Sequence, residues 1–237
     1  MTALPLREPW RTLRLGCLAA AAAAASPAVA QVAVEGALLS DYRVRGYSVS
    51  RGEPAASLSF SYDHPSGIYV GATAAGNFHD GEPELAGFQA NVGYAFRLGP
   101  AVSLDAGVAR SEYYYAYGGG QLAYTELYFG VAAPHVSARV SYSPNYYRAD
   151  TSTLYAEVDG GIEPVPDWVL SAHAGVFSYL GGRPYFLPRK RYDWRIGAAR
   201  KFGASALRLD LSGRVQGSPA RRATDATALV LSLTHGF

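Results

Sequence analysis

The chain has 237 residues, of which 49% are hydrophobic and 17% charged, a balance that excludes a disordered or fibrous protein. The formal net charge of +2 is too small for a domain that binds nucleic acid through its phosphates, so no nucleic-acid partner is expected.

The first 30 residues have the pattern of a cleaved secretory signal peptide. Three arginines precede an unbroken apolar stretch from Leu15 to Ala25, and Ala28-Val29-Ala30 supplies the small residues of a cleavage site. This stretch is too short for a spanning helix, which needs about 20 residues. We therefore expect a signal peptide at 1–30 and one mature domain at 31–237. Of 21 basic and 19 acidic side chains, the signal takes three arginines and one glutamate, which leaves 18 of each sign.

Segments with period-two alternation of apolar and polar residues then follow one another to the C-terminus, as β-strands do. In the last one, leucines at 229, 231 and 233 alternate with Val230, Ser232 and Thr234. Twelve strands are predicted, at 32–45, 55–63, 67–77, 86–98, 101–112, 122–133, 136–146, 152–163, 167–180, 191–202, 205–216 and 226–237.

The connections between these strands tend to alternate in length, which predicts short turns at one end of the sheet and longer loops at the other. Short connections contain turn residues, as in Leu98-Gly99-Pro100 and Phe202-Gly203-Ala204. The longer ones are predicted at 46–54, 78–85, 113–121, 147–151, 180–190 and 217–225.

The charges on the polar rows decide which way the strands face. Arg208, Asp210 and Arg214 share one parity, and in a dry core such charges would each cost several kcal/mol unless paired. This disfavours a soluble sandwich or lipocalin-like barrel, whose apolar rows face inward. We expect an all-β fold, a transmembrane antiparallel up-and-down β-barrel of about 12 strands, with apolar rows in lipid and polar rows around a wet lumen.

The inward rows supply the predicted pore-lining residues. Both signs occur in similar number, so we expect weak ion selectivity unless the charges are segregated across the lumen. The residues are Arg97, Arg139, Arg195, Arg208, Arg214, Asp105, Glu126, Glu157, Asp159, Asp193 and Asp210.

Aromatic residues cluster near the predicted strand ends, as in the girdles of outer-membrane barrels. One girdle is predicted at Tyr113, Tyr114, Tyr115, Tyr117, Tyr146, Tyr147, Tyr179 and Tyr185, and the other at Tyr62, Tyr94, Phe96, Trp168, Phe202 and Phe237. The terminal Phe237, with apolar residues at alternate positions before it, resembles the C-terminal signal that the bacterial barrel-assembly machinery reads.

Two stretches carry a family resemblance. Residues 39–48, which read Leu-Ser-Asp-Tyr-Arg-Val-Arg-Gly-Tyr-Ser and are followed by Pro54, resemble the opening S-D-Y-x-x-R-G-x-S segment of the TorF-type porins of proteobacteria. Residues 62–71 are similar to that family's second signature, and Asn77 also fits. The motif residues are Asp41, Tyr42, Arg45, Gly46, Pro54, Gly67, Tyr69 and Gly71. The resemblance implies an outer-membrane porin and brings no substrate.

The charged part of the first motif has two interpretations. Asp41, Arg43 and Arg45 share a parity with Glu35, which places alternating charges on the lumen wall near the outer mouth. There they would line an entrance, or they would hold the first loop by an ion pair with Gly46 permitting the turn.

No enzymatic site is expected. The five histidines show no metal-binding spacing, no cofactor is implied, and no nucleophile has a base beside it in sequence. His135-Val136-Ser137 is similar to the His-x-Ser of lipid A deacylase barrels, but it falls in a short turn at the predicted periplasmic end. His173 shares the inward parity of the Glu157 strand, as a solvated wall residue or half of a pH-sensitive pair.

The longest predicted loop is basic. Arg183, Arg189, Lys190 and Arg191 would meet phosphate-bearing lipopolysaccharide if this loop faces outward, because guanidinium groups bind phosphate well. The alternative is a charged loop that only keeps the protein soluble.

The sequence thus predicts a barrel in the cell outer membrane, surrounded by lipid and lipopolysaccharide, that lets small polar or ionic solutes diffuse passively. The alternative is a non-conducting structural or envelope-interaction barrel, which a lumen filled by ion pairs would favour.

Overall fold

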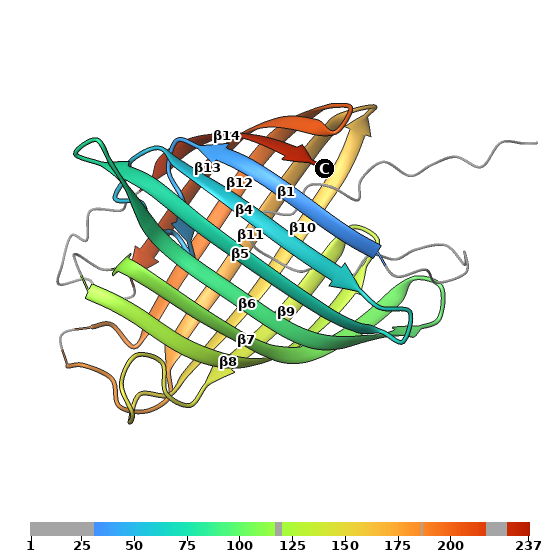
Figure 1. Ribbon diagram of the computed structural model, residues 1–237. Helices are drawn as coiled ribbons and strands as arrows, with labels where there is room; N and C mark the ends of the chain where they lie inside the picture. The colour runs from blue at the N-terminus through green and yellow to red at the C-terminus, as the bar shows by residue number, and fades with distance from the viewer. Residues whose placement is uncertain (1–30, 117–119, 186, 217–226) are drawn as a thin grey trace, which may run out of the picture.

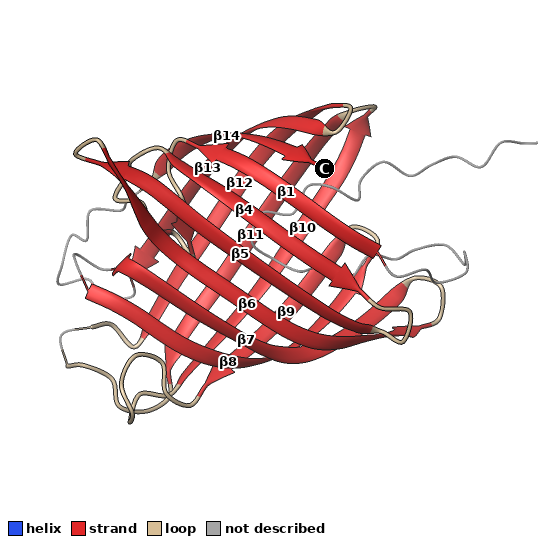
Figure 2. Ribbon diagram, in the orientation of Figure 1, coloured by secondary structure: helices blue, strands red, loops and turns tan. Residues whose placement is uncertain are grey.

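The computed structural model describes residues 31–116, 120–185, 187–216 and 227–237 (Figure 1). The predicted signal peptide and Tyr117 lie outside these residues. All regular elements in the described part of the chain are β-strands (Figure 2), and no helix there is long and apolar enough to cross a membrane.

Twelve of the strands form a closed barrel in which each pairs antiparallel with its neighbours in sequence, as predicted. They are β1 (Gln31–Leu39), β4 (Ala55–Asp63), β5 (Ile68–His79), β6 (Glu82–Leu98), β7 (Val102–Ala116), β8 (Gly120–Ala133), β9 (Val136–Ser143), β10 (Thr153–Val165), β11 (Trp168–Tyr179), β12 (Lys190–Phe202), β13 (Ser205–Gln216) and β14 (Ala228–Gly236). Two short strands, β2 (Arg43–Val44) and β3 (Tyr47–Ser48), form a separate hairpin.

The barrel closes through the first and last strands. β1 pairs with β14 from Glu35 opposite Gly236 to Leu39 opposite Ser232, and its other edge pairs with β4. Closure leaves no unpaired sheet edge, which is the condition for a sheet in hydrocarbon, where each unsatisfied backbone group costs several kcal/mol.

The apolar rows face outward and the polar rows face inward, as predicted. In β14 the leucines at 229, 231 and 233 are 63%, 49% and 46% exposed, whereas Ser232 and Thr234 between them are 2% and 4% exposed. The same alternation follows β13, where Leu209 is 46% exposed and Asp210 6%. The outside is therefore an apolar belt and the inside is polar, the inverse of a soluble barrel.

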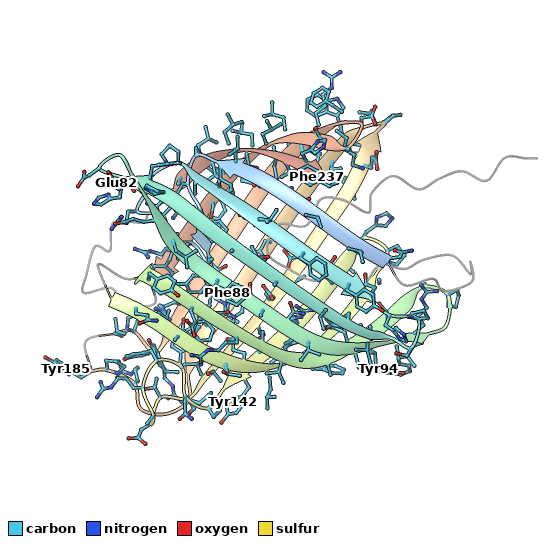
Figure 3. The ribbon with its side chains drawn as sticks, in the orientation of Figure 1. Glu82, Phe88, Tyr94, Tyr142, Tyr185 and Phe237 are labelled. Carbon is cyan, nitrogen blue, oxygen red and sulfur yellow. The ribbon has the colours of Figure 1, made fainter. Side chains whose placement is uncertain are left out.

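The two ends of the barrel differ, and the start of β1 and Phe237 lie at the same one. Short turns join the strands at this end, which we call the turn end, and the backbone N–H of Phe237 donates to Val34 there. The opposite end, the loop end, carries segments 40–54, 144–152 and 180–189. Figure 3 shows Tyr94 and Phe237 at the turn end and Tyr185 at the loop end.

Two predicted loops at the loop end are strand instead. β5 and β6 meet in the two-residue turn Asp80-Gly81, and β7 and β8 extend into the predicted loop 113–121. β6, β7 and β8 have 17, 15 and 14 residues, more than the 9–11 that a crossing needs. The prediction was wrong here because these hairpins continue beyond the apolar belt, where alternation no longer marks a strand.

The two predicted aromatic girdles have different outcomes. At the turn end, Tyr94, Phe96 and Phe202 are about half-exposed on the outer surface, as expected. At the loop end, Tyr113, Tyr146 and Tyr179 are only 2–4% exposed because they point into the barrel. The prediction that these three tyrosines form an outer girdle was wrong, because they belong to a cluster inside the lumen.

Candidate functional site

The segment 40–54, which connects β1 to β4, folds into the barrel instead of projecting from it; we call it the inward segment. β1 ends at Leu39, so the predicted strand 32–45 was wrong in its second half. The hairpin of β2 and β3 has Arg45-Gly46 as its two-residue turn, with φ of +50° and +75°. Positive φ at both positions is typical of the mirror-image turns that suit hairpins. The turn presents Arg45 at the tip.

The tip of the inward segment crosses the lumen to the opposite strands. Both terminal nitrogens of Arg45 donate to Glu126 of β8, at 2.9 and 2.8 Å. The Arg45 guanidinium also lies 4.0 Å from the ring centroid of Tyr155 on β10. The Tyr47 ring is 3.9 Å from the guanidinium of Arg214 and 5.4 Å from that of Arg191. Charge-assisted bidentate and cation–π contacts of this kind hold the hairpin in place.

Asp41 organises the base of the inward segment. Its carboxylate is 7% exposed and accepts hydrogen bonds from Arg43 at 2.7 Å, from Ser50 at 3.1 Å and from Ser48. Arg43 in turn donates to the carbonyl of Gly46 at 2.7 Å. The ion pair that the motif suggested therefore lies within the segment, and the contact to the wall is made by Arg45.

An aromatic cluster fills the loop end of the lumen around the inward segment. Val49 of the inward segment packs in it, and the ring centroids of Tyr124 and Tyr146 are 4.5 Å apart. The guanidinium of Arg191 lies 4.1 Å from the ring centroid of Phe177 in the same cluster. The buried members are Val49, Tyr113, Leu122, Tyr124, Tyr146, Tyr155, Phe177 and Tyr179.

A cavity of about 1330 Å³ occupies the rest of the lumen. It reaches the turn end at residues 63–68 and at Phe237, and it extends inward as far as Arg45, Tyr113 and Tyr124. Val49, Tyr146 and Phe177, nearer the loop end, do not line it. Among the described residues the cavity therefore extends from the turn end to the inward segment.

Ion pairs occupy the walls of this cavity. Arg139 donates to Asp105 at 2.8 Å, and the hydroxyl of Tyr69 donates to the same carboxylate at 2.7 Å. On the other side, Arg208 donates to Asp210 at 2.6 Å. Arg139 reaches Asp105 from β9 to β7, across the intervening β8, whereas Arg208 and Asp210 are two residues apart on β13. Pairing offsets part of the cost of their burial.

Three carboxylates surround His173. Its Nδ1 lies 2.9 Å from Asp159 and its Nε2 lies 2.9 Å from Asp193. His173, Asp159 and Glu157 offer three potential ligand atoms within 4.8 Å of one another, which no spacing in the sequence indicated. Both imidazole nitrogens already have carboxylate partners, so the ring serves as a bridge between two strands.

Every predicted pore-lining residue lies on an inward row of the barrel. Those in contact with the cavity are Arg97, Arg139, Arg195, Asp105, Glu126, Glu157, Asp193 and Asp210. The other three contact inward groups: Arg208 pairs with Asp210, Asp159 with His173, and Arg214 stacks on Tyr47. Of the motif residues, Asp41, Tyr42, Arg45, Gly46, Gly67, Tyr69 and Gly71 line the cavity, whereas Pro54 is exposed.

The residues of the predicted basic loop lie in two different environments. Arg183 and Arg189 are exposed in the connection 180–189, and Lys190 is exposed as the first residue of β12. Arg191 was wrongly placed on the loop: it lies in β12 and is 5% exposed, with its guanidinium inside the lumen near Phe177. The strand parity of Arg191 with Asp193 would have indicated this.

Sequence reasoning missed two groups that shape the lumen. Tyr69 was recognised only as a motif residue, yet it bridges Asp105 and Tyr128, whose hydroxyl is 2.8 Å away. Glu35 was noted only for its parity, yet it lines the cavity. Parity places both side chains inward, but it does not tell which neighbours they meet.

Comparison with known proteins places this chain in a family. Residues 21–213 match the family model described as a bacterial protein of unknown function (Gcw_chp). The chain belongs to the Gcw_chp family. No curated protein matches this sequence.

Solved structures share its fold. A KdgM porin superposes with a TM-score of 0.53 at 11% identity, over 86% of this chain and 99% of that one. A NanC porin gives 0.52 at 10% identity, over 87% and 98%. A KdgM porin in complex with disordered oligogalacturonate gives 0.50 at 9% identity, over 88% and 99%. At such identities the likeness shows the fold, which is that of outer-membrane porin-like barrels.

Proposed function

We propose that this protein is an outer-membrane channel through which small polar or ionic solutes diffuse passively, with the inward segment as the part that closes it. The observation that carries the proposal is the cavity: a polar lumen of about 1330 Å³ runs from the turn end to the inward segment inside an apolar belt. The fold shared with porins and the resemblance of residues 38–77 to TorF-type porins support a channel.

The orientation follows from bacterial barrels of this kind, which have short turns on the periplasmic side and longer loops outside. The turn end then faces the periplasm and the inward segment closes the extracellular half. Solutes would cross when the hairpin leaves Glu126, which requires losing a bidentate ion pair and the stacking of Arg45 on Tyr155. The stacking of Tyr47 on Arg214 and the packing of Val49 in the aromatic cluster would also have to be released.

The test is conductance in a planar lipid bilayer, with the wild type beside Arg45→Gln, which removes the charge that holds the hairpin tip. We expect rare openings in the wild type and more frequent ones in Arg45→Gln. The matched control is Arg110→Gln, because Arg110 forms an exposed ion pair with Glu112 at 2.9 Å away from the inward segment. Absence of conductance in all three, while a reference porin conducts, would refute the channel.

A second candidate is a non-conducting barrel that supports the envelope or binds a partner through its loops. The ion pairs that Arg45, Arg139 and Arg208 form inside the lumen favour it. In this case the exposed Arg183, Arg189 and Lys190 would bind lipopolysaccharide phosphates. Co-purification of lipopolysaccharide that is lost in the triple glutamine variant, without conductance, is the expected result.

We propose no enzymatic activity. The His135-Val136-Ser137 stretch lies at the turn end, with His135 in the turn and Val136 opening β9. In the proposed orientation it is on the opposite side of the membrane from lipopolysaccharide. Outer-membrane fractionation after expression with its signal peptide tests the localisation.

A further inference from the structure

One side of the lumen is lined by small side chains. It consists of β14, β1, β4 and β5, whose inward rows carry mostly hydroxyl groups and alanines, with Tyr69 of β5 as a large exception. We call it the small-residue wall. Among its inward residues are Ala33, Ala37, Ser57, Ser59, Ser61, Thr73, Ser232 and Thr234.

Glu35 is the charged side chain in the middle of the small-residue wall. It lies halfway along β1, opposite Ser59 of β4 and Gly236 of β14, and it lines the cavity. Ser59 has its own partner in Thr73, at 2.9 Å between the hydroxyl oxygens. Within the described part of the chain, no hydrogen bond or ion pair involves the Glu35 carboxylate.

Two further residues of the cavity carry an oxygen without a partner in the described part of the chain, and both lie closer to the loop end than Glu35. Ser232 is 2% exposed and its hydroxyl has no hydrogen-bond partner among the described residues. Asp210, on the adjacent β13, is 6% exposed; its Oδ2 accepts from Arg208, but its Oδ1 has no partner there. Both residues line the same cavity as Glu35. Buried polar atoms normally have partners, so these oxygens point to a ligand or to ordered water.

Several arginines that face the cavity or its wall are paired with carboxylates. Arg45, Arg139 and Arg208 each have a carboxylate oxygen within 2.8 Å. Arg195 lies 3.7 Å from Asp159. Arg97, which also lines the cavity, is exposed at the turn end, one residue before the end of β6. The pathway beyond this rim therefore presents an unneutralised carboxylate and hydroxyl oxygens, which are ligands for cations.

We propose that the solute pathway prefers cations and that Glu35 is the residue that sets this preference. The proposal rests on the channel function proposed above and identifies the class of solute. A fixed charge without a counter-ion attracts cations and repels anions, and the attraction strengthens where protein walls lower the dielectric constant. The proposed preference would exceed the weak selectivity expected from the overall charge balance, because Arg45, Arg139 and Arg208 are paired with carboxylates, whereas Glu35 has no partner among the described residues.

The experiment is the reversal potential of the purified full-length mature protein under a potassium chloride gradient at mildly alkaline pH. We expect a cation preference in the wild type and a loss on the order of five-fold in the permeability ratio in Glu35→Gln. Glu112→Gln is the matched control, since Glu112 pairs with Arg110 away from the cavity. It should leave the ratio unchanged.

A second variant keeps the test decisive if Glu35→Gln does not fold. Ser61 lines the cavity on β4, and Ser61→Asp adds a carboxylate to the same wall. It should raise the cation preference. Conductance with an unchanged ratio in both variants, or an anion preference in the wild type, would overturn the role of Glu35. Absence of conductance altogether would instead refute the channel, and with it this proposal.

Discussion

The turn at the tip of the inward segment offers a sharp test of the closing role of that segment. Gly46 has φ of +75°, and a Cβ added there would lie 3.0 Å from the Cβ of Arg214 and 3.1 Å from the Cβ of Asp193. Both atoms are at the bases of their side chains, so neither moves away easily. Gly46→Ala should therefore push the hairpin away from β12 and β13 while leaving the barrel strands intact.

The magnitude follows from two costs. An alanine in the left-handed region costs about 1 to 2 kcal/mol. Overpacking against fixed atoms adds about 1 to 3 kcal/mol. Gly52→Ala is the matched control, because Gly52 is in the same segment with φ of +78° but has nothing within 4 Å of its added Cβ. Gly52→Ala therefore carries only the cost of the left-handed backbone conformation. Each 1.4 kcal/mol changes an equilibrium about tenfold, so the open population of Gly46→Ala should exceed that of Gly52→Ala by about 5- to 140-fold.

Single-channel recording measures this difference as the fraction of time spent open. Heat-modifiable mobility on gels would first establish that both variants form barrels. If Gly46→Ala opens no more often than Gly52→Ala, contact of the hairpin with β12 and β13 does not control closure, and the reasoning fails. Lower conductance in Gly46→Ala with the barrel intact would contradict it equally.

Two other predictions concern stability and pH. Asp105→Asn removes the charge that Arg139 faces at 2.8 Å and should lower the free energy of unfolding in detergent by about 2 to 3 kcal/mol. Glu112→Gln, in an exposed ion pair, should lower it by less than about 1 kcal/mol. Equal losses in urea titrations would count against a structural role for the ion pair in the lumen. The hydrogen bond from His79, at 2.6 Å, lowers the pKa of Glu53 at the end of the inward segment below its ordinary value of 4.5. A carboxyl whose pKa is lower in the folded state stabilises that state above the ordinary pKa and loses this contribution as the pH falls. The protection factors for hydrogen exchange at residues 50–53, corrected for the intrinsic rate at each pH, should therefore fall below about pH 4.5. Constant protection factors down to about pH 3 would contradict the assignment.

The orientation of the strands was within reach of the sequence because it depends on local pattern and on the cost of burying charge. Alternation with period two placed Asp210 on one face and Leu209 on the other, and the structure confirms both. The predicted aromatic girdle at the loop end was wrong for a related reason. Tyr113 lies on an inward row, but the prediction followed its clustering with other tyrosines along the chain and not its parity.

The sequence by itself determined a closed barrel of twelve antiparallel strands with its apolar rows outside. The period-two alternation identifies each strand, and the cost of burying charged side chains decides which of its faces points into the lumen. Only the tertiary structure decided how the lumen is filled. Arg45 meets Glu126 across 81 residues of sequence, and the direction in which segment 40–54 turns depends on the space that four distant strands leave for it. The lack of a partner for Glu35 is likewise a property of the assembled lumen, because it depends on which side chains the closed sheet brings opposite β1.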